Sequence, residues 1–184
     1  LIMYKRFLKN LLPEQKRLRK RILEISNASQ FSHLGSCLTA IDVIDALYQV
    51  KNSDEKFILS NGHAAIAWYV VLEKHGFITD PQMINTLHIH PDRNPALDIH
   101  VSTGSLGLGI TIATGMALAN PNITIHCIIS DGECAEGSVW EALRFIDEQQ
   151  LKNIQIHANI NGYAAYKPIN IRKYNIHRGI TFSL

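Results

Sequence analysis

Two isoleucine-rich runs, each followed by a polar turn and separated by one helical segment, constrain the fold of this chain most strongly. Residues 123–129, ITIHCII, contain four isoleucines, and residues 153–160, NIQIHANI, form the second run. This composition is typical of strands buried on both faces of a parallel sheet. Together with a helix expected from about 137 to 150, the two runs form a βαβ unit with a right-handed crossover. We therefore predict an α/β fold, a parallel sheet with helices on both faces.

The segments before this unit continue the alternation of helices and a strand. Residues 13–29 place apolar side chains on one side and basic groups on the other, as amphipathic helices do. Thr39 is expected to cap a second helix, and a glycine-rich turn at 103–109 precedes an apolar one. The expected elements are helices at 13–29, 40–50, 64–76 and 110–119 and a short strand at 56–60. We expect residues 1–166 to form one α/β domain and residues 167–184 an irregular basic tail.

Composition excludes several classes of protein. With 184 residues, 46% of them hydrophobic and 18% charged, the chain can fill the core of one domain. Its 18 basic and 16 acidic side chains include no long basic block, so no nucleic-acid partner is expected. Three cysteines without a CxxC pair favour a reducing, cytoplasmic location over a disulfide framework. We expect neither a signal peptide nor a membrane span, because no apolar run is long enough for one.

Two polar turns follow the isoleucine-rich runs and suggest a cation site. Asp131 comes directly after the first run, and Asn161 comes directly after the second, 30 positions later. Parallel strands end at the same edge of a sheet, where ligands bind in α/β folds. Carboxylate, amide and backbone oxygens are the ligands that Mg²⁺ or Ca²⁺ prefers, so Asp131, Asn161 and the backbone oxygen of Tyr163 could share one ion. Gly132 would let a phosphate approach the backbone. The competing interpretation is that Asp-Gly here is an ordinary turn.

The glycine-rich turn and three histidines suggest further contacts. Residues 103–109, TGSLGLG, could present backbone amides to a phosphate, or could only pack a helix tightly against its neighbours. His33, His63 and His90 lie in turns, where imidazoles can transfer protons or bind hydroxyl and phosphate groups. A zinc site built on His88 and His90 is disfavoured, because no cysteine or carboxylate accompanies them at ligand spacing.

Six motifs together resemble the diphosphate-binding domain of the transketolases, which use thiamine diphosphate. They are SHLG (32–35), LSNGHA (59–64), HPD (90–92), STGSLGLG (102–109), SDGECAEGSVWEA (130–142) and ANINGY (158–163). The order and spacing of these motifs follow those of the family over residues 31 to about 166. In this family the cofactor serves as an electron sink while a two-carbon ketol unit passes from a ketose phosphate to an aldose. The resemblance therefore implies a thiamine-diphosphate-dependent transferase acting on sugar phosphates.

The resemblance also assigns roles to individual residues. Asp131, Asn161 and the backbone oxygen of Tyr163 would hold the metal. His33, His63 and His90 would serve in catalysis, with His63 facing the diphosphate. Glu136 and Glu141 resemble the acidic pair that the family buries near its dimer contact, so self-association is expected. The residues expected to contact the cofactor are His63, Gly104, Leu106, Gly132, Glu133, Glu136 and Asn161.

Several positions depart from the family pattern. Ser130 stands where a glycine is usual, and its hydroxymethyl group could crowd the phosphate. Asn159 and His100 stand where acidic residues are common. The loss of a carboxylate at 159 would be expected to weaken the order around the metal ligands.

The family needs a pyrimidine domain, whose glutamate activates the cofactor, and no segment after residue 166 is long enough to form one. The resemblance therefore implies a split enzyme whose second chain carries that domain. Two alternatives remain open at this point. One is a degenerate module that keeps the fold without catalysis. The other is a related enzyme, deoxyxylulose-phosphate synthase or a 2-oxo-acid decarboxylating component, although LSNGHA and TGSLGLG look more like transketolase.

Overall fold

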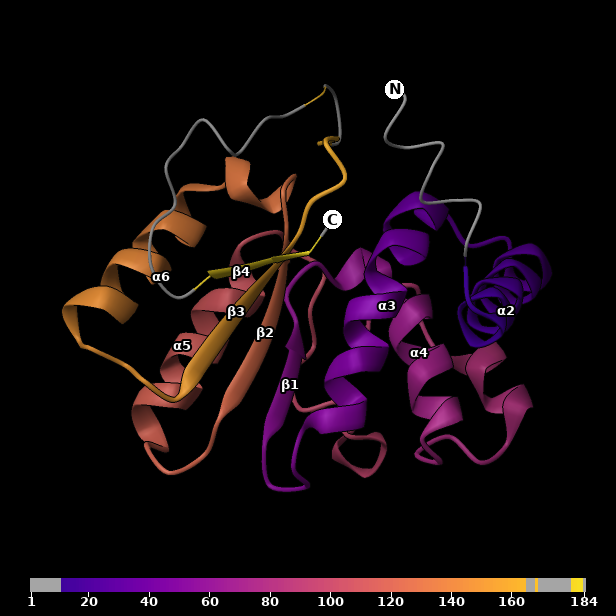
Figure 1. The fold of residues 1–184 in the computed structure, drawn as a ribbon, viewed down its shortest axis with the longest axis horizontal. Coiled ribbons are helices and arrows are strands. Elements are labelled where there is room, and N and C mark those ends of the chain that lie inside the picture. The colour runs from indigo at the N-terminus through magenta and orange to yellow at the C-terminus, as the bar shows by residue number, and fades with distance from the viewer. Residues whose placement is uncertain (1–10, 165–167, 169–179, 184) are drawn as a thin grey trace.

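The computed structural model describes residues 11–164, 168 and 180–183 and confirms the α/β fold (Figure 1). Four parallel strands lie in the order β1-β2-β3-β4. They are β1 (Lys56–Leu59), β2 (Ile125–Ser130), β3 (Ile154–Asn159) and β4 (Ile180–Ser183). The longer helices are α2 (Pro13–Ser29), α3 (Leu34–Val50), α4 (Ala65–Lys74), α5 (Leu108–Ala119) and α6 (Gly137–Glu148). Short 3₁₀ turns span Gly62–Ala64, Pro81–Thr86, Pro95–Leu97 and Glu133–Ala135.

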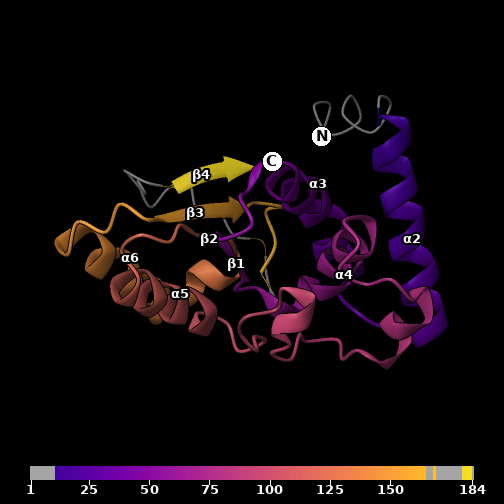
Figure 2. The ribbon, with the colours of Figure 1, turned by 90° about the horizontal axis from the view of Figure 1, so that it is seen from below.

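Alternating side chains of the strands fill two cores, one on each face of the sheet. Phe57 and Leu59 of β1 face the core formed with α2, α3 and α4. Ile58, between them, faces the core formed with α5 and α6. This alternation follows from the two-residue period of a strand. Figure 2 shows α5 and α6 on one side of the sheet, α3 on the other, and α2 and α4 beyond β1 next to α3. The sheet is therefore sandwiched, as the isoleucine-rich runs predicted.

Helix α3 begins six residues earlier than the sequence indicated. Thr39 was expected to cap it, but the helix starts at Leu34, and His33 occupies the N-cap with a positive φ of 64°. Thr39 instead lies inside the helix, where its hydroxyl can donate to the carbonyl oxygens of Gly35 or Ser36, both 3.1 Å away. The expectation was wrong because a threonine hydroxyl can bond backward to a carbonyl of the preceding turn as readily as it caps.

Strand β4 lies within the segment that was expected to be an irregular tail. It pairs in parallel with β3, from Ile156 opposite Ile180 to Asn159 opposite Ser183. This pairing provides hydrogen-bond partners for backbone groups of β3 that would be unpaired if β3 were the edge strand. The expectation is corrected for residues 180–183. Most of the remaining tail lies outside the described residues.

A buried ion pair ties the loop before the glycine-rich turn to α3. Asp98 accepts a hydrogen bond from the Tyr48 hydroxyl at 2.8 Å and lies 3.1 Å from the Lys51 ammonium group. His100, which stands where acidic residues are common, lies 3.0 Å from the other Asp98 oxygen. These contacts lower the pKa of Asp98 against the opposing effect of its burial. The loop is thereby held in place for the site described below.

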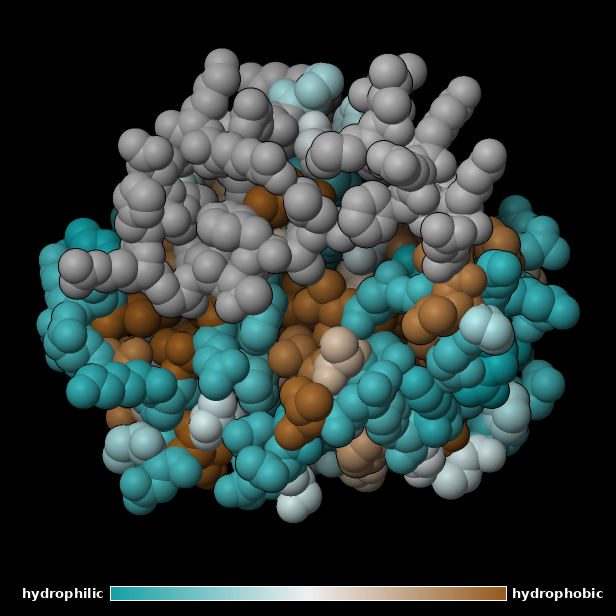
Figure 3. All heavy atoms as spheres, in the orientation of Figure 1, coloured by the Kyte–Doolittle hydropathy of each residue, from teal (hydrophilic) through white to brown (hydrophobic). Residues whose placement is uncertain are grey.

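The outer surface is mainly hydrophilic. On the face viewed in Figure 3, smaller hydrophobic patches lie between hydrophilic side chains. The large hydrophobic side chains that stand exposed include Leu108 and Leu118 on α5 and Tyr163 after β3. Within the described part of the chain, no helix combines the length and apolar character needed to cross a bilayer.

Candidate functional site

The loops that follow β2 and β3 meet at the side chain of Asp131. Ser130 and Asn159 are opposite each other in the sheet, so both strands end at the same level. The Asp131 carboxylate accepts hydrogen bonds from the backbone N–H of Asn161 at 3.1 Å and of Gly162 at 2.5 Å. Its other oxygen accepts from the N–H of Gly132 at 3.0 Å. The structure therefore brings together the two turns that the sequence singled out.

The remaining oxygen ligands proposed for the cation lie in the same place. The Asn161 side-chain oxygen accepts from the Tyr163 N–H at 2.9 Å, which fixes its direction and leaves a second lone pair. A side chain at Gly132 would come within 3.3 Å of the Ala164 Cα and 3.6 Å of the Tyr163 carbonyl oxygen. Glycine at 132 therefore keeps this backbone approach open. Tyr163 is 69% exposed, so its backbone and not its ring is the part expected to belong to the cluster.

Burial of the Asp131 carboxylate favours a positive partner. Its burial raises the pKa, although the backbone N–H donors of Gly162, Gly132 and Asn161 act in the opposite direction. A divalent cation would relieve this cost of burying a negative charge. Among the described residues, no three His, Cys, Asp or Glu side chains are grouped to hold a metal. A cation here would therefore depend on one carboxylate together with amide, backbone and cofactor oxygens, as Mg²⁺ sites commonly do.

Glu133 lies beside this cluster and not within it. Its carboxylate is completely buried and accepts from the Ser60 hydroxyl at 2.5 Å and the Gly107 N–H at 2.7 Å. Burial raises its pKa, while these donors lower it. The side chain joins the loops after β1 and β2 to the start of α5. Glu133 was expected to contact the cofactor, but this geometry favours a role in holding the surrounding loops.

The three histidines singled out by the sequence come together from three separate loops. The rings of His33 and His63 have centroids 5.1 Å apart, and those of His33 and His90 are 6.4 Å apart. His33 precedes α3, His63 lies in the turn after β1, and His90 follows the 3₁₀ turn Pro81–Thr86. His33 and His90 are exposed and His63 is half-buried. The arrangement can offer several imidazole nitrogens to one polar ligand.

His63 is expected to stay neutral at pH 7. Burial, and secondarily the His33 and His90 rings, lower its pKa to about 4. The pKa of His157 in β3 is also lowered to about 4, by burial and by His126. In the unfolded chain both imidazoles bind a proton near pH 6.5. The folded state, which keeps them neutral, therefore has its full stability above that pH and loses stability as the pH falls toward 4. NMR titration of the imidazole resonances should give His63 a midpoint near 4, and a midpoint near 6.5 would contradict this burial.

The glycine-rich turn packs against both the His63 turn and His90. A side chain at Gly62 would come within 2.7 Å of the Gly104 nitrogen, and one at Gly104 within 2.9 Å of the His90 ring. Leu106 is half-buried in the same turn. Next to Gly62, Asn61 is fully buried, and neither of its side-chain polar atoms has a hydrogen-bond partner among the described residues. An unpaired buried amide is costly, so this part of the site has hydrogen-bonding capacity for a polar ligand.

Two glycines of α5 provide a matched test of this packing. A methyl group at Gly109 would come within 2.5 Å of the Ser60 Cα, whereas one at Gly115 would meet nothing within 4 Å. Gly109→Ala should therefore lower the free energy of unfolding by about 1–3 kcal/mol through overpacking. Gly115→Ala should raise it by about 0.5–1 kcal/mol, because alanine is the better helix former. Urea unfolding measures both changes. Equal effects of the two substitutions would show that α5 is not closely packed against Ser60, the residue after β1.

The remaining sequence candidates lie around these two clusters. The Ser130 hydroxyl accepts from the Glu133 N–H at 3.2 Å, so it is held within its own turn. Glu136 precedes α6 as its N-cap and Glu141 lies on that helix, and both are exposed in the single chain. Asn159 is 2% exposed and donates from its amide to the Thr39 hydroxyl at 3.1 Å. The polar partners Ser60 and Thr39 were not assigned from sequence, because their contacts depend on distant segments.

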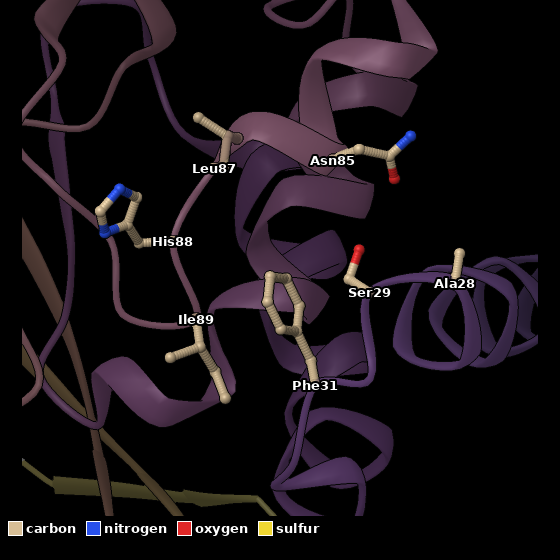
Figure 4. Close-up of a pocket in the computed structure, with 7 residues that line it drawn as sticks. All are labelled: Ala28, Ser29, Phe31, Asn85, Leu87, His88 and Ile89. Carbon is tan, nitrogen blue, oxygen red and sulfur yellow. The ribbon is translucent and has the colours of Figure 1, made fainter.

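A cavity of about 610 Å³ lies beside the histidines (Figure 4). Its lining segments are residues 28–31 and 85–89, which run directly into His33 and His90. In Figure 4, Phe31 and Ile89 lie on opposite sides of the same space, and the Asn85 amide points away from them. The lining residues are Ala28, Ser29, Phe31, Asn85, Leu87, His88 and Ile89. They include hydroxyl, amide and imidazole groups but neither lysine nor arginine.

Comparison with protein families gives one match over most of the chain. Residues 4–174 match the family model described as 1-deoxy-D-xylulose-5-phosphate synthase. Among curated proteins, transketolase-like protein 2 from Bos taurus is 33% identical over 165 residues, and human transketolase is 32% identical over 169. Each alignment covers 79% of this chain and 26% of the relative. The chain therefore spans about a quarter of the length of these relatives.

A shorter relative and a solved structure complete the comparison. The shorter relative, from Phocaeicola vulgatus, is one subunit of an apulose-4-phosphate transketolase. It is 32% identical over 156 residues, which cover 74% of this chain and 55% of the relative. A transketolase structure from Leishmania mexicana superposes with a TM-score of 0.70 at 19% identity, covering 90% of this chain and 31% of that one. The structural match shows a shared fold.

Proposed function

This chain belongs to the family of the 1-deoxy-D-xylulose-5-phosphate synthases and transketolases, and from that premise we propose that it is the diphosphate- and Mg²⁺-binding part of a transketolase-like enzyme. The reaction proposed is the transfer of a two-carbon ketol unit between sugar phosphates. One observation carries the proposal: the Asp131 carboxylate binds the backbone of Asn161 and Gly162, which brings the turns after β2 and β3 to one point.

The residues present fit a divalent cation and a diphosphate. Asp131 would supply the carboxylate, Asn161 the amide oxygen and Tyr163 the backbone oxygen. Burial raises the Asp131 pKa, and a cation would favour the charged form. Gly132 lets the loop after β3 approach the loop after β2, because a side chain there would come within 3.3 Å of the Ala164 Cα. A glycine beside the proposed metal also suits a phosphate held close to the chain. Ca²⁺ could occupy the same oxygen ligands, and the chain itself does not distinguish the two ions.

Thiamine diphosphate, when bound, would supply the electron sink for the carbon that is transferred. The residues of this chain would orient the groups around it. Neutral His63 can donate or accept a hydrogen bond with a phosphate or hydroxyl oxygen, depending on its tautomer. His33 and His90, the two exposed members of the cluster, would hold sugar hydroxyls and move protons at those oxygens. Gly104 and Leu106 would line the path between the histidines and the metal loops.

We propose that a pyrimidine domain on another polypeptide or segment completes the active site, because in the family that domain provides the glutamate that activates the cofactor. The relative that is named as one subunit of a transketolase supports an arrangement in separate chains. The exposed positions of Glu136 and Glu141 suit an interface, where a second copy or the partner would cover them. We propose that residues 1–166, together with strand β4, which pairs with β3, form the diphosphate-binding unit.

The sugar's phosphate would be bound elsewhere. Among the residues that the structure describes, none that lines the cavity next to His33 and His90 is cationic, and phosphate groups are usually held by arginine, lysine or helix N-termini. We propose that the partner supplies these groups. The identity of the sugar is therefore set largely outside this chain.

Isothermal titration calorimetry tests the proposed function directly. Thiamine diphosphate should bind this chain in the presence of Mg²⁺, and the binding should be lost when EDTA removes the ion. Turnover of a ketose phosphate with an aldose acceptor should appear only when a pyrimidine-domain chain is added. No binding with Mg²⁺, with or without that partner, would refute the proposal and leave a non-catalytic module of the same fold.

A second candidate follows from the description of the matching family model. A deoxyxylulose-phosphate synthase condenses pyruvate with a triose phosphate, using the same type of cofactor site. In the assembled enzyme, activity with pyruvate and none with a ketose phosphate donor would favour this candidate. The transketolase names of the curated relatives favour the first.

A further inference from the structure

Asn159 connects the proposed metal loops to helix α3. As the last residue of β3, it accepts a backbone hydrogen bond from the Asp131 N–H at 3.2 Å through its carbonyl oxygen. Its side-chain amide donates to the Thr39 hydroxyl at 3.1 Å, across 120 positions of sequence. Asn159 is only 2% exposed, so water does not compete for these contacts. Asn159 therefore contacts both the backbone of Asp131, the proposed metal ligand, and helix α3.

The direction of these hydrogen bonds suits an amide at position 159. The Thr39 hydroxyl has a single proton, and the carbonyl oxygens of Gly35 and Ser36, both 3.1 Å away, can accept it. The Thr39 oxygen is then free to accept from the Asn159 amide. An ionised aspartate at 159 could only accept, and it would compete for the same proton. Asparagine thus completes a chain of hydrogen bonds in which the Asn159 amide donates to Thr39 and the Thr39 hydroxyl donates to the first turn of α3.

The first turn of α3 follows directly after His33. The His33 carbonyl oxygen accepts from the Cys37 N–H at 3.2 Å, and His33 itself holds a left-handed backbone conformation at the N-cap. The position of its ring relative to His63 therefore depends on how this turn is held. The Asn159–Thr39 hydrogen bond fixes the turn from the side of the sheet.

We propose that Asn159 and Thr39 are positioning residues that couple the Asp131–Asn161 loops to His33. The inference rests on the proposed function, because it concerns how binding of Mg²⁺ and thiamine diphosphate at those loops reaches the histidine cluster. In this view, asparagine in place of an acidic residue at 159 does not weaken the order around the metal ligands. The asparagine amide donates a hydrogen bond that the Thr39 oxygen accepts, which a carboxylate could not do.

The test compares Thr39→Val and Thr39→Ser in the complete chain, with Mg²⁺ and thiamine diphosphate as the probe. In the wild type, adding the probe should shift the imidazole resonances of His33. Thr39→Val should abolish most of that shift. It should also raise the dissociation constant of the probe about 5- to 20-fold, which is within the range of ordinary coupling between sites. Thr39→Ser keeps the hydroxyl and should preserve both responses. Thr114→Val is the matched control, because it removes a buried hydroxyl that bonds only to the Ile110 carbonyl in its own helix.

Each outcome decides the proposal. If Thr39→Val lowers stability but leaves the dissociation constant and the His33 shift unchanged, the pair is merely structural and the inference is overturned. If the wild type binds no probe, the proposed function fails separately. The coupling is then judged in the free chain by Asn159→Asp, which must shift the His33 ring resonances as well as those of its own loop. Changes confined to residues beside position 159 would overturn it.

Discussion

Replacing Asp131 with alanine is expected to abolish measurable binding of thiamine diphosphate in the presence of Mg²⁺. The substitution removes the single carboxylate of the proposed ligand set and also the acceptor that holds the Asn161 and Gly162 backbone. Loss of groups that merely orient metal ligands weakens binding on the order of 10- to 100-fold, so loss of a ligand should weaken it by about 100-fold or more. Calorimetric titration of the variant against the wild type measures the change.

Two further variants make this result interpretable. Asp131→Asn keeps the shape of the side chain but places an NH₂ group among backbone donors, and it should also lose the Mg²⁺-dependent binding. Asp54→Ala removes an exposed carboxylate and produces the same change in net charge. It should bind as the wild type does. Retention of full affinity by Asp131→Asn in a folded chain would show that the cation lies elsewhere.

Glu133→Ala should produce the largest loss of stability among substitutions at the site. The carboxylate is 0% exposed and accepts hydrogen bonds from Ser60 and Gly107, with a longer contact of 3.4 Å from the Ser130 N–H. Truncation would leave these donors buried without an acceptor and open a cavity. We expect the free energy of unfolding to fall by about 3–5 kcal/mol, because buried donors left without an acceptor cost about 1–3 kcal/mol each and the lost side chain leaves a cavity.

Glu136→Ala is the control for the loss of stability expected from Glu133→Ala. Glu136→Ala, at an exposed position three residues later, should change the free energy of unfolding by less than about 0.5 kcal/mol. Glu133→Gln should fall between the two, since its oxygen can still accept while its NH₂ group faces the Ser130 N–H. Urea denaturation followed by circular dichroism provides all three values. A loss below about 1 kcal/mol for Glu133→Ala would mean that the three loops hold together without this carboxylate.

The meeting of Asp131 and Asn161 could be predicted because it follows from local pattern and topology. Consecutive buried strands joined by one helix are parallel neighbours, so residues directly after each strand must lie at the same edge. Gly132 was expected to let a phosphate approach the backbone, and in the structure the backbone of the loop after β3 approaches it. Short-range periodicity was sufficient for these conclusions because the face of each strand that packs on α5 and α6 is fully apolar.

Other features depend on contacts between distant segments and could not be derived in this way. The grouping of His33, His63 and His90 was expected only from the family resemblance, since three separate loops carry them. The contact of Glu133 with the cofactor was expected from the family resemblance. Its contact with Ser60, 73 positions away, could not be foreseen, because nothing in the local sequence marks it. Thr39 was taken for a cap because a hydroxyl before an apolar helical segment fits either role. Strand β4 is short, and only pairing with β3 identifies it.

The central claim is that one divalent ion binds between the turns after β2 and β3, and paramagnetic NMR with Mn²⁺ in place of Mg²⁺ tests it most directly. With thiamine diphosphate present, substoichiometric Mn²⁺ should broaden the amide resonances of Asp131, Gly132 and Asn161–Tyr163 first. The resonances of His88 and Asp92, on the outer side of the histidine cluster, should be affected less. Broadening centred on those two residues, or uniform weak broadening across the chain, would contradict the assignment of this site.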